Sequence, residues 1–378
     1  MVAWPLTPPL QAGLIWRLIE TLCFAICIFY TVRFWGKESK YIIGGFVFVV
    51  AYWFLNAFLA DIDAYYIRGI ALSIFLAYAI FSPGLTNFKF KKSLRNIIQI
   101  NIILLIFWNI ISTYMYSVIP NLTRLFTVGD NINPTEYGVS PTVLAMCLNF
   151  AQLYVQILFI PLIFLDLLYG KTLNRPISII YLISVVVLVL NSGFSTAIIC
   201  LSVVVVGLLF AKSSHNTLSF IFKYIAVFCV AYAVIDVIGQ LLLDFVENPV
   251  IRAKLLYFFG PDHSTSYTFE RTDLWLMSLN SFLEYPLGGG QEVGGHSAFL
   301  DFFGQYGLVA GIIFLVLIYH IPYKAYRKAL TQFERNTIII FVIILSLILA
   351  LNPIQFAYGI AVFVFLPYFI NSNRILTK

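Results

Sequence analysis

Long apolar segments alternate with short polar connections along almost the whole chain of 378 residues. A helix needs about 20 mostly apolar residues to cross a bilayer, because each residue advances the helix by about 1.5 Å. This pattern predicts an all-α, polytopic transmembrane helical bundle of about 11 spans. The expected spans are residues 13–32, 41–60, 65–81, 97–118, 142–168, 177–190, 193–210, 219–243, 297–319, 337–350 and 353–370.

Two of these spans, 177–190 and 193–210, nearly touch at Asn191 and Ser192. We interpret this arrangement as two short helices joined by a tight hairpin, and one long kinked helix is the alternative. No internal repeat and no low-complexity linker divides the chain. Residues 1–378 are therefore expected to form a single transmembrane domain.

The composition and the distribution of charge support a membrane protein. The chain is 61% hydrophobic and only 11% charged, whereas soluble domains contain about 25% charged residues. Seventeen of its 23 lysines and arginines lie in or just beside alternate connections, five lie in or just beside the other connections, and Arg17 lies in the first span. Because basic connections stay in the cytoplasm, the amino terminus and the long loops 119–141 and 244–296 are expected to face outward. The lipid bilayer is thus an expected partner, and nucleic acid is not.

The five cysteines all lie in apolar segments, so we interpret them as small buried hydrophobic residues rather than as a disulfide framework. The long loop 244–296 is acidic, with seven carboxylates and three basic residues. A helical spacing of apolar residues within it predicts a short amphipathic helix on the membrane surface. These apolar residues are Leu274, Trp275, Leu279, Phe282 and Leu283. Long loops are usually functional, although this loop could instead shield the bundle.

His296 and Arg271 are the candidate catalytic residues of this loop. His296 precedes an apolar segment, and an imidazole with an unperturbed pKa of about 6.5 can exchange a proton near neutral pH. Asp301, five residues further on, is a candidate for orienting its ring. Arg271 could hold a diphosphate in a bidentate manner. The alternatives are a hydrogen-bonded interfacial histidine and an exposed ion pair of Arg271 with Glu270 or Asp273.

The sequence gives little support for a metal or cofactor site. It contains no His-Glu-x-x-His or Cys-x-x-Cys spacing, and the nearby ligand pairs are Asp262 with His263 and Glu292 with His296. The three glycines at 288–290 are not followed by Gly-Lys-Ser or Gly-Lys-Thr, so they predict a turn rather than a phosphate-binding loop. We therefore expect neither a metal nor a cofactor.

Four motifs follow one another between Thr268 and Gly311. They are an arginine at 271, a Pro-Leu-Gly turn at 286–288, a histidine at 296 and a Gly-Leu-x-x-Gly helix at 307–311. This order and spacing resemble the O-antigen polymerase and O-antigen ligase family of membrane glycosyltransferases. The resemblance implies a family-C-type glycosyltransferase bundle with its active site on the periplasmic side of the bacterial inner membrane.

The resemblance also implies a reaction. The expected function is polymerisation of undecaprenyl-diphosphate-linked oligosaccharide repeat units of O-antigen or a related surface polysaccharide. The transfer would be inverting and independent of metal, and a chain-length-regulating membrane protein is an expected partner. The alternative within the family is an O-antigen ligase that transfers glycan to lipid A–core. From another class, the alternative is a flippase for lipid-linked oligosaccharides.

The resemblance assigns the roles of base to His296 and of diphosphate ligand to Arg271, with two departures from the family pattern. The family usually has asparagine after the histidine, where this chain has Ser297. The family also carries an arginine in a polar break two spans before the long loop, and residues 191–196 contain none. Another cation must then contact the diphosphate, and Arg68 is the first choice. The expected substrate-binding residues are Arg68, Arg124, Arg252, Lys254, Tyr267 and Ser297.

Overall fold

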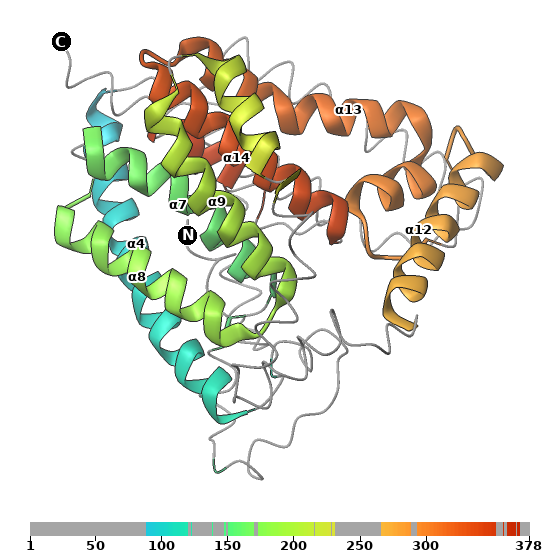
Figure 1. The fold of residues 1–378 in the computed structure, drawn as a ribbon, viewed down its shortest axis with the longest axis horizontal. Coiled ribbons are helices and arrows are strands. Elements are labelled where there is room, and N and C mark those ends of the chain that lie inside the picture. Colours follow the sequence, from blue (N-terminus) through green and yellow to red (C-terminus); the bar gives the residue numbers. More distant parts are fainter. Residues whose placement is uncertain are drawn as a thin grey trace.

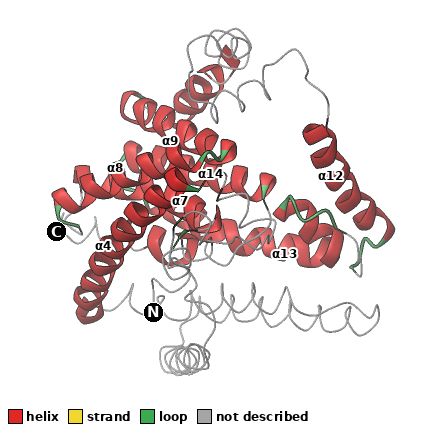
Figure 2. Ribbon diagram, turned by 90° about the horizontal axis from the view of Figure 1, so that it is seen from below, coloured by secondary structure: helices red, strands yellow, loops and turns green. Residues whose placement is uncertain are grey.

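The computed structural model describes residues 88–119, 122, 138, 147–148, 150–169, 173–214, 216–227, 229–230, 266–288, 293–352, 358, 361–367 and 369–370. All regular elements in these residues are helices (Figures 1 and 2). They are α4 (Phe88–Val118), α7 (Phe150–Tyr169), α8 (Arg175–Ser192), α9 (Ser195–Ser213), α12 (Ser266–Glu284), α13 (Ala298–Lys328), α14 (Gln332–Leu351) and the π-helical turn η3 (Ala361–Phe365). A shorter apolar helix covers Thr217–Val227.

Six of the described helices are long and apolar enough to cross a membrane, namely α4, α7, α8, α9, α13 and α14. The prediction of an all-helical, multi-pass membrane protein is therefore confirmed for this part of the chain. The expected spans 13–32, 41–60 and 65–81 lie outside the described residues. The expected spans 142–168, 219–243 and 353–370 lie partly outside them.

The helices α8 and α9 are separate, as the hairpin interpretation predicts. Gly193 ends α8 with a left-handed conformation (φ 61°, ψ 15°), which glycine adopts without steric cost. Ser192 supports this turn, because its Oγ donates to the carbonyl of Val189 (2.7 Å) and accepts from the amide of Phe194 (3.2 Å). The single kinked helix is thus wrong.

The start of α7 differs from the expected boundary. The pattern predicts helix from Thr142, whereas Cys147 and Leu148 are not helical and α7 is described from Phe150. The preceding Leu148 is bound to α4 instead, because its amide donates to Ser112 Oγ (2.9 Å) and its carbonyl accepts from the hydroxyl of Tyr116. These tertiary hydrogen bonds take up the backbone groups that would otherwise extend the helix.

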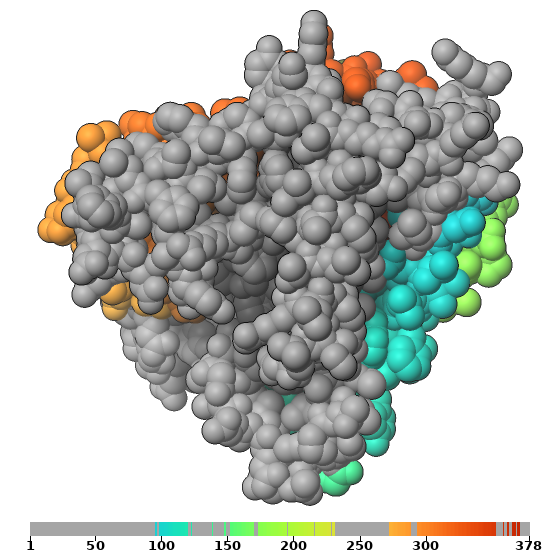
Figure 3. Space-filling view, turned by 180° about the vertical axis from the view of Figure 1, so that it is seen from behind, coloured from blue at the N-terminus to red at the C-terminus, as the bar shows by residue number. Residues whose placement is uncertain are grey.

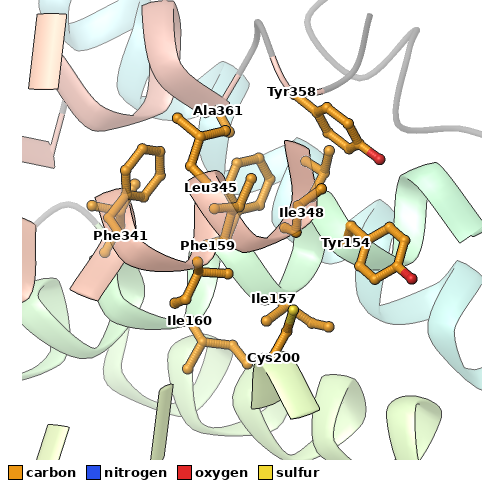
Figure 4. Close-up of a cluster of buried hydrophobic side chains, with 14 of the residues drawn as sticks. Tyr154, Ile157, Phe159, Ile160, Cys200, Phe341, Leu345, Ile348, Tyr358 and Ala361 are labelled. Atoms are coloured by element: carbon orange, nitrogen blue, oxygen red, sulfur yellow. The ribbon is translucent and has the colours of Figure 1, made fainter. Parts of the chain in front are cut away.

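The core of the bundle lies around α7, which packs against α8, α9 and α14. Figure 4 shows Phe159 and Ile160 of α7 meeting Cys200 of α9 and Leu345 of α14 in one buried cluster. The ring of Phe159 also stacks on Phe365 of η3, with centroids 4.1 Å apart. The helices that surround α7 are therefore held by large, well-packed apolar side chains.

Two of the described cysteines, Cys147 and Cys200, are buried as expected, whereas Cys229 is exposed, and none of the three is in a disulfide. Asp166 of α7 is also buried, and its Oδ2 accepts a hydrogen bond from the amide of Leu173 (2.9 Å). This carboxylate fixes the connection between α7 and α8.

Basic residues lie at one end of the bundle. There, Phe333 of α14 contacts Tyr169 of α7 (ring centroids 5.6 Å), and Asn336 of α14 donates to the carbonyl of Ala211 in α9 (3.1 Å). This end carries Arg175, Lys212, Lys324, Arg327, Lys328 and Arg335. The opposite end, where α13 begins beside the end of α14, is called the outer end below. The gathering of these basic residues at one end agrees with the orientation predicted from the distribution of lysine and arginine.

A kink at Gly307 divides α13 into a short arm, residues 298–306, and a long arm, residues 308–328. The long arm can cross a bilayer by itself, which takes about 20 helical residues. Figure 1 shows α12 beside the short arm, and α12 packs against α13. The space-filling view shows α12 and α4 at opposite edges of the molecule (Figure 3). The kink and α12 thus form a distinct unit at one side of the bundle.

The amphipathic helix predicted in the long loop lies within α12, and the predicted apolar residues divide between two faces, since Leu274 lies against Gly294. Ser278 and Ser281 are buried, whereas Leu279 and Leu283 are exposed. The small serines allow α12 to approach α13 closely, as small residues do between membrane helices. The two leucines therefore point away from the bundle.

Candidate functional site

The segment that enters α13 carries His296 at the outer end. Ser297 is the N-cap of α13, and its Oγ accepts a hydrogen bond from the amide of Leu300 (3.3 Å). The amide of Ala298 donates to the carbonyl of Asn352 after α14 (2.8 Å). His296 itself is half-buried. The candidate base thus directly precedes a helix start that is held in place on two sides, and Ser297, predicted to bind substrate, caps the helix with a buried side chain.

Asp301, in the first turn of α13, organises the backbone around His296. Its Oδ1 accepts hydrogen bonds from Ser278 Oγ (2.6 Å) and from the amide of Gly295 (3.2 Å). Its Oδ2 accepts from the amide of Ser297 (3.1 Å). The two amides flank His296, and the carboxylate also interacts electrostatically with the imidazole. Asp301 therefore fixes the chain on both sides of the candidate base.

Ser278 links α12 to this segment. Its buried Oγ accepts a hydrogen bond from the amide of Gly294 (2.9 Å) while it donates to Asp301. Gly294 also lies directly against the backbone carbonyl of Leu274, so a Cβ atom at this position would overlap α12. Glycine is required here because the two backbones are in contact.

Tyr267 and Arg271 lie on the same face of α12 as Leu274 and Ser278. The steps of four, three and four residues between them follow one face of an α-helix. Because Leu274 contacts the segment that precedes His296, this face of α12 is the one turned towards the start of α13. The fold thus brings the positions of the two predicted ligand-binding residues to the side of α12 that holds the histidine segment.

The Pro-Leu-Gly turn and the Gly-Leu-x-x-Gly motif contact each other. The amide of Leu308 donates to the carbonyl of Pro286 (2.8 Å), and Ser281 Oγ donates to the carbonyl of Gly304 (3.3 Å). In a regular helix, the amide of Leu308 would bond to Gly304 itself. Gly307 adopts φ 72° and ψ −178°, a conformation almost restricted to glycine, and a Cβ there would overlap the turn. Both motifs therefore share a structural role, which is to join α12 to the kink of α13.

Two further polar groups accompany α12. Trp275 lies one turn after Arg271, and its buried indole N–H has no hydrogen-bond partner among the residues that the structure describes. At the other end of the helix, a hydrogen bond to Glu284 raises the pKa of the Tyr285 hydroxyl. The buried indole N–H is thus without a partner among the described residues, whereas the tyrosine hydroxyl is paired with Glu284.

The remaining predicted substrate-binding residues, Arg68, Arg124, Arg252 and Lys254, lie outside the described residues. The second cation for a diphosphate thus stays a prediction. The polar break between α8 and α9, where the family pattern has an arginine, is used for the turn at Gly193.

Sequence reasoning missed the role of Ser278. It looks like a neutral interruption of an apolar stripe, and its partner Asp301 is 23 residues away. The available signal is that Ser278 shares a helical face with Leu274, so a polar side chain was present on the side that packs. Asp301 was expected to orient the ring of His296, whereas the observed hydrogen bonds go to the backbone amides beside it.

No protein-family model matches the chain, and no curated protein is similar to it. Its function is therefore inferred from the motif order and from the contacts around His296.

Proposed function

We propose that the protein is a membrane glycosyltransferase that polymerises undecaprenyl-diphosphate-linked oligosaccharide repeat units at the outer face of the bacterial inner membrane. One observation carries the proposal: His296, Asp301 and the face of α12 that includes Arg271 converge at the outer end of the bundle. A base beside a fixed carboxylate, with an arginine position on the helix that packs against this segment, suits transfer from a diphosphate donor.

The proposed step is an inverting displacement. The acceptor hydroxyl oxygen attacks the anomeric carbon of the donor sugar while His296 takes the hydroxyl proton. The bond from that carbon to the diphosphate oxygen breaks, and its electron pair leaves with undecaprenyl diphosphate. A sugar hydroxyl is a very weak acid, so a positioned base contributes about 10²–10⁴-fold to the rate.

Arg271 would stabilise the leaving group, because the diphosphate gains negative charge in the transition state. A guanidinium binds phosphate oxygens with two parallel hydrogen bonds. The indole N–H of Trp275, one turn further along α12, has no hydrogen-bond partner among the described residues and would supply a further donor of neutral charge. A second cation is still needed, and Arg68 is its first candidate.

The experiment that tests this function starts from deletion of the gene. A polymerase predicts loss of long glycan chains while a single capped repeat is retained. Total loss of surface glycan would indicate a ligase, and repeat units trapped on the cytoplasmic side would indicate a flippase. Complementation with His296→Ala should fail, whereas His320→Ala is a matched control, since His320 lies in α13 near its basic end and away from the segment that carries His296. Normal chains from the His296→Ala variant would remove the histidine from the mechanism.

A further inference from the structure

The surface of α12 that points away from α13 carries an apolar stripe. Its residues follow one helical face with steps of three and four, and the stripe continues into the turn after the helix. They are Leu276 (47% exposed), Leu279 (39%), Leu283 (66%) and Leu287 (66%). The polar residues Asp273, Asn280 and Glu284 form an exposed stripe beside them. The helix thus has a third face in addition to its packed and its polar face.

This apolar stripe lies opposite the face that packs within the protein. Leu274, Ser278 and Ser281 provide the packed face, and they contact the histidine segment and the short arm of α13. At 100° per residue, the centre of the leucine stripe is nearly half a turn away from them. The leucines therefore do not belong to the core of the bundle.

The apolar stripe is continuous with the exposed side of the long arm of α13. The hydrogen bond from Leu308 to Pro286 holds the turn that contains Leu287 against the kink. From there, Leu308, Ile312 and Val316 follow with steps of four residues and are 45%, 49% and 59% exposed. Since α13 is long and apolar enough to cross a membrane, we expect the exposed side of its long arm to contact lipid chains.

We infer that α12 is docked in the outer interface of the bilayer, with Leu276, Leu279 and Leu283 among the lipid chains. Although it has 19 residues, α12 is not among the six described helices that are apolar enough to span. Its polar stripe keeps Asp273, Asn280 and Glu284 at the level of headgroups and water, as in interfacial helices. The occupant of the leucine stripe is thus lipid of the surrounding bilayer.

Docking has a consequence that rests on the proposed function. The packed face of α12 also carries the positions of Tyr267 and Arg271, and it holds the segment with His296. A helix lying in the interface keeps these residues at the depth of phosphate headgroups. The diphosphate of a membrane-anchored donor lies at this same depth.

Photocrosslinking of the full-length protein in lipid nanodiscs tests the docking. Benzoylphenylalanine replaces Leu279 or Leu283, and the matched controls carry it at the neighbouring polar positions Asn280 or Glu284. Mass spectrometry after irradiation should find phospholipid adducts in the variants that replace Leu279 or Leu283. The variants that replace Asn280 or Glu284 should show no such adducts. Equal lipid adducts at all four positions overturn the inference, and so do crosslinks from the leucine positions to a second copy of the chain or another protein.

A second measurement uses the unmodified protein. A phospholipid with a photoactivatable group in its acyl chain should label the peptide that contains Leu276, Leu279 and Leu283, and an unlabelled peptide contradicts docking. Neither experiment needs enzymatic activity, so the two proposals fail separately. Lipid adducts without polymerisation would contradict only the proposed function, whereas polymerisation without lipid adducts would contradict only the proposed docking of α12.

Discussion

Asp301 accepts hydrogen bonds from the two amides that flank His296, so it acts on the histidine through the backbone. In Asp301→Asn, an amide NH2 replaces one carboxylate oxygen, so the side chain can no longer accept from both Gly295 and Ser297. A shift of the base by about 1 Å can reduce turnover by about 10²-fold, so kcat should fall while KM for the lipid-linked donor changes little.

The pH profile of Asp301→Asn separates a positioning role from a merely structural one. A neighbouring carboxylate favours the protonated imidazole, and a protonated imidazole cannot accept a proton. Removing the negative charge should therefore move the acidic limb of the activity profile to lower pH. An unchanged limb together with an unchanged kcat would show that Asp301 does not act on His296.

Arg271 offers a second test at the residue scale. Arg271→Lys keeps the positive charge but loses the planar, bidentate grip on phosphate. Polymerisation should fall to a small fraction of the wild-type rate, with the loss in both kcat and kcat/KM. Arg327→Lys, at the basic end of α13, is the matched control and should leave the rate unchanged. Near-full activity of Arg271→Lys would show that any positively charged side chain suffices at this position.

The sequence reveals candidate residues only where the residues that act together follow one another closely along the chain. His296, Arg271 and the Pro-Leu-Gly turn stand out because of their order along the chain. The hydrogen bond from Ser278 to Asp301 and the one from Leu308 to Pro286 join residues more than 20 positions apart. No periodicity encodes such pairs, since they depend on how α12 lies against α13.

At the scale of the elements, the kink of α13 depends on Gly307. Gly307→Ala places a Cβ against the backbone of the turn at 286–288, in a conformation that L-residues avoid. We expect the folded state to lose about 2–5 kcal/mol, which combines backbone strain and overpacking. The midpoint of thermal unfolding in the same detergent measures the effect.

Gly138→Ala is the matched control for this experiment. Gly138 also has a positive φ (65°), but no atom of the described residues lies within 4 Å of a Cβ built there. Only the left-handed strain of about 1–2 kcal/mol applies to it. Equal shifts in the two variants would mean that contact with the turn does not hold the kink.

The boundaries of the helices were predictable where bilayer thickness sets their length. The cores of α8, α9 and α14 fall inside the apolar segments, and Thr331 with Glu334 forms the capping box that starts α14. The start of α7 was not predictable, because Ser112 and Tyr116 of another helix bind the backbone of Leu148. The sequence also did not show which face of α12 packs against α13, because the buried serines that allow the close contact carry no apolar signal.

At the scale of the whole molecule, the basic end of the bundle should lie in the cytoplasm. An epitope inserted after Ala329, between α13 and α14, should bind antibody only after spheroplasts are permeabilised. An epitope in the loop 244–296 should bind without permeabilisation. Both results follow from the positive-inside rule. Antibody access to the first epitope in intact spheroplasts would reverse the orientation and would put His296 on the wrong side for the proposed donor.

The most direct test of the central proposal is a reaction with purified protein, phospholipid and undecaprenyl-diphosphate-linked repeat units. The measurement follows the length of the glycan and the release of undecaprenyl diphosphate in the same sample. The account predicts a ladder of longer glycans with one undecaprenyl diphosphate released for each linkage formed, and loss of both products in His296→Ala. Repeat units that cross the bilayer without forming longer glycans, or an undiminished ladder from the histidine variant, would contradict it.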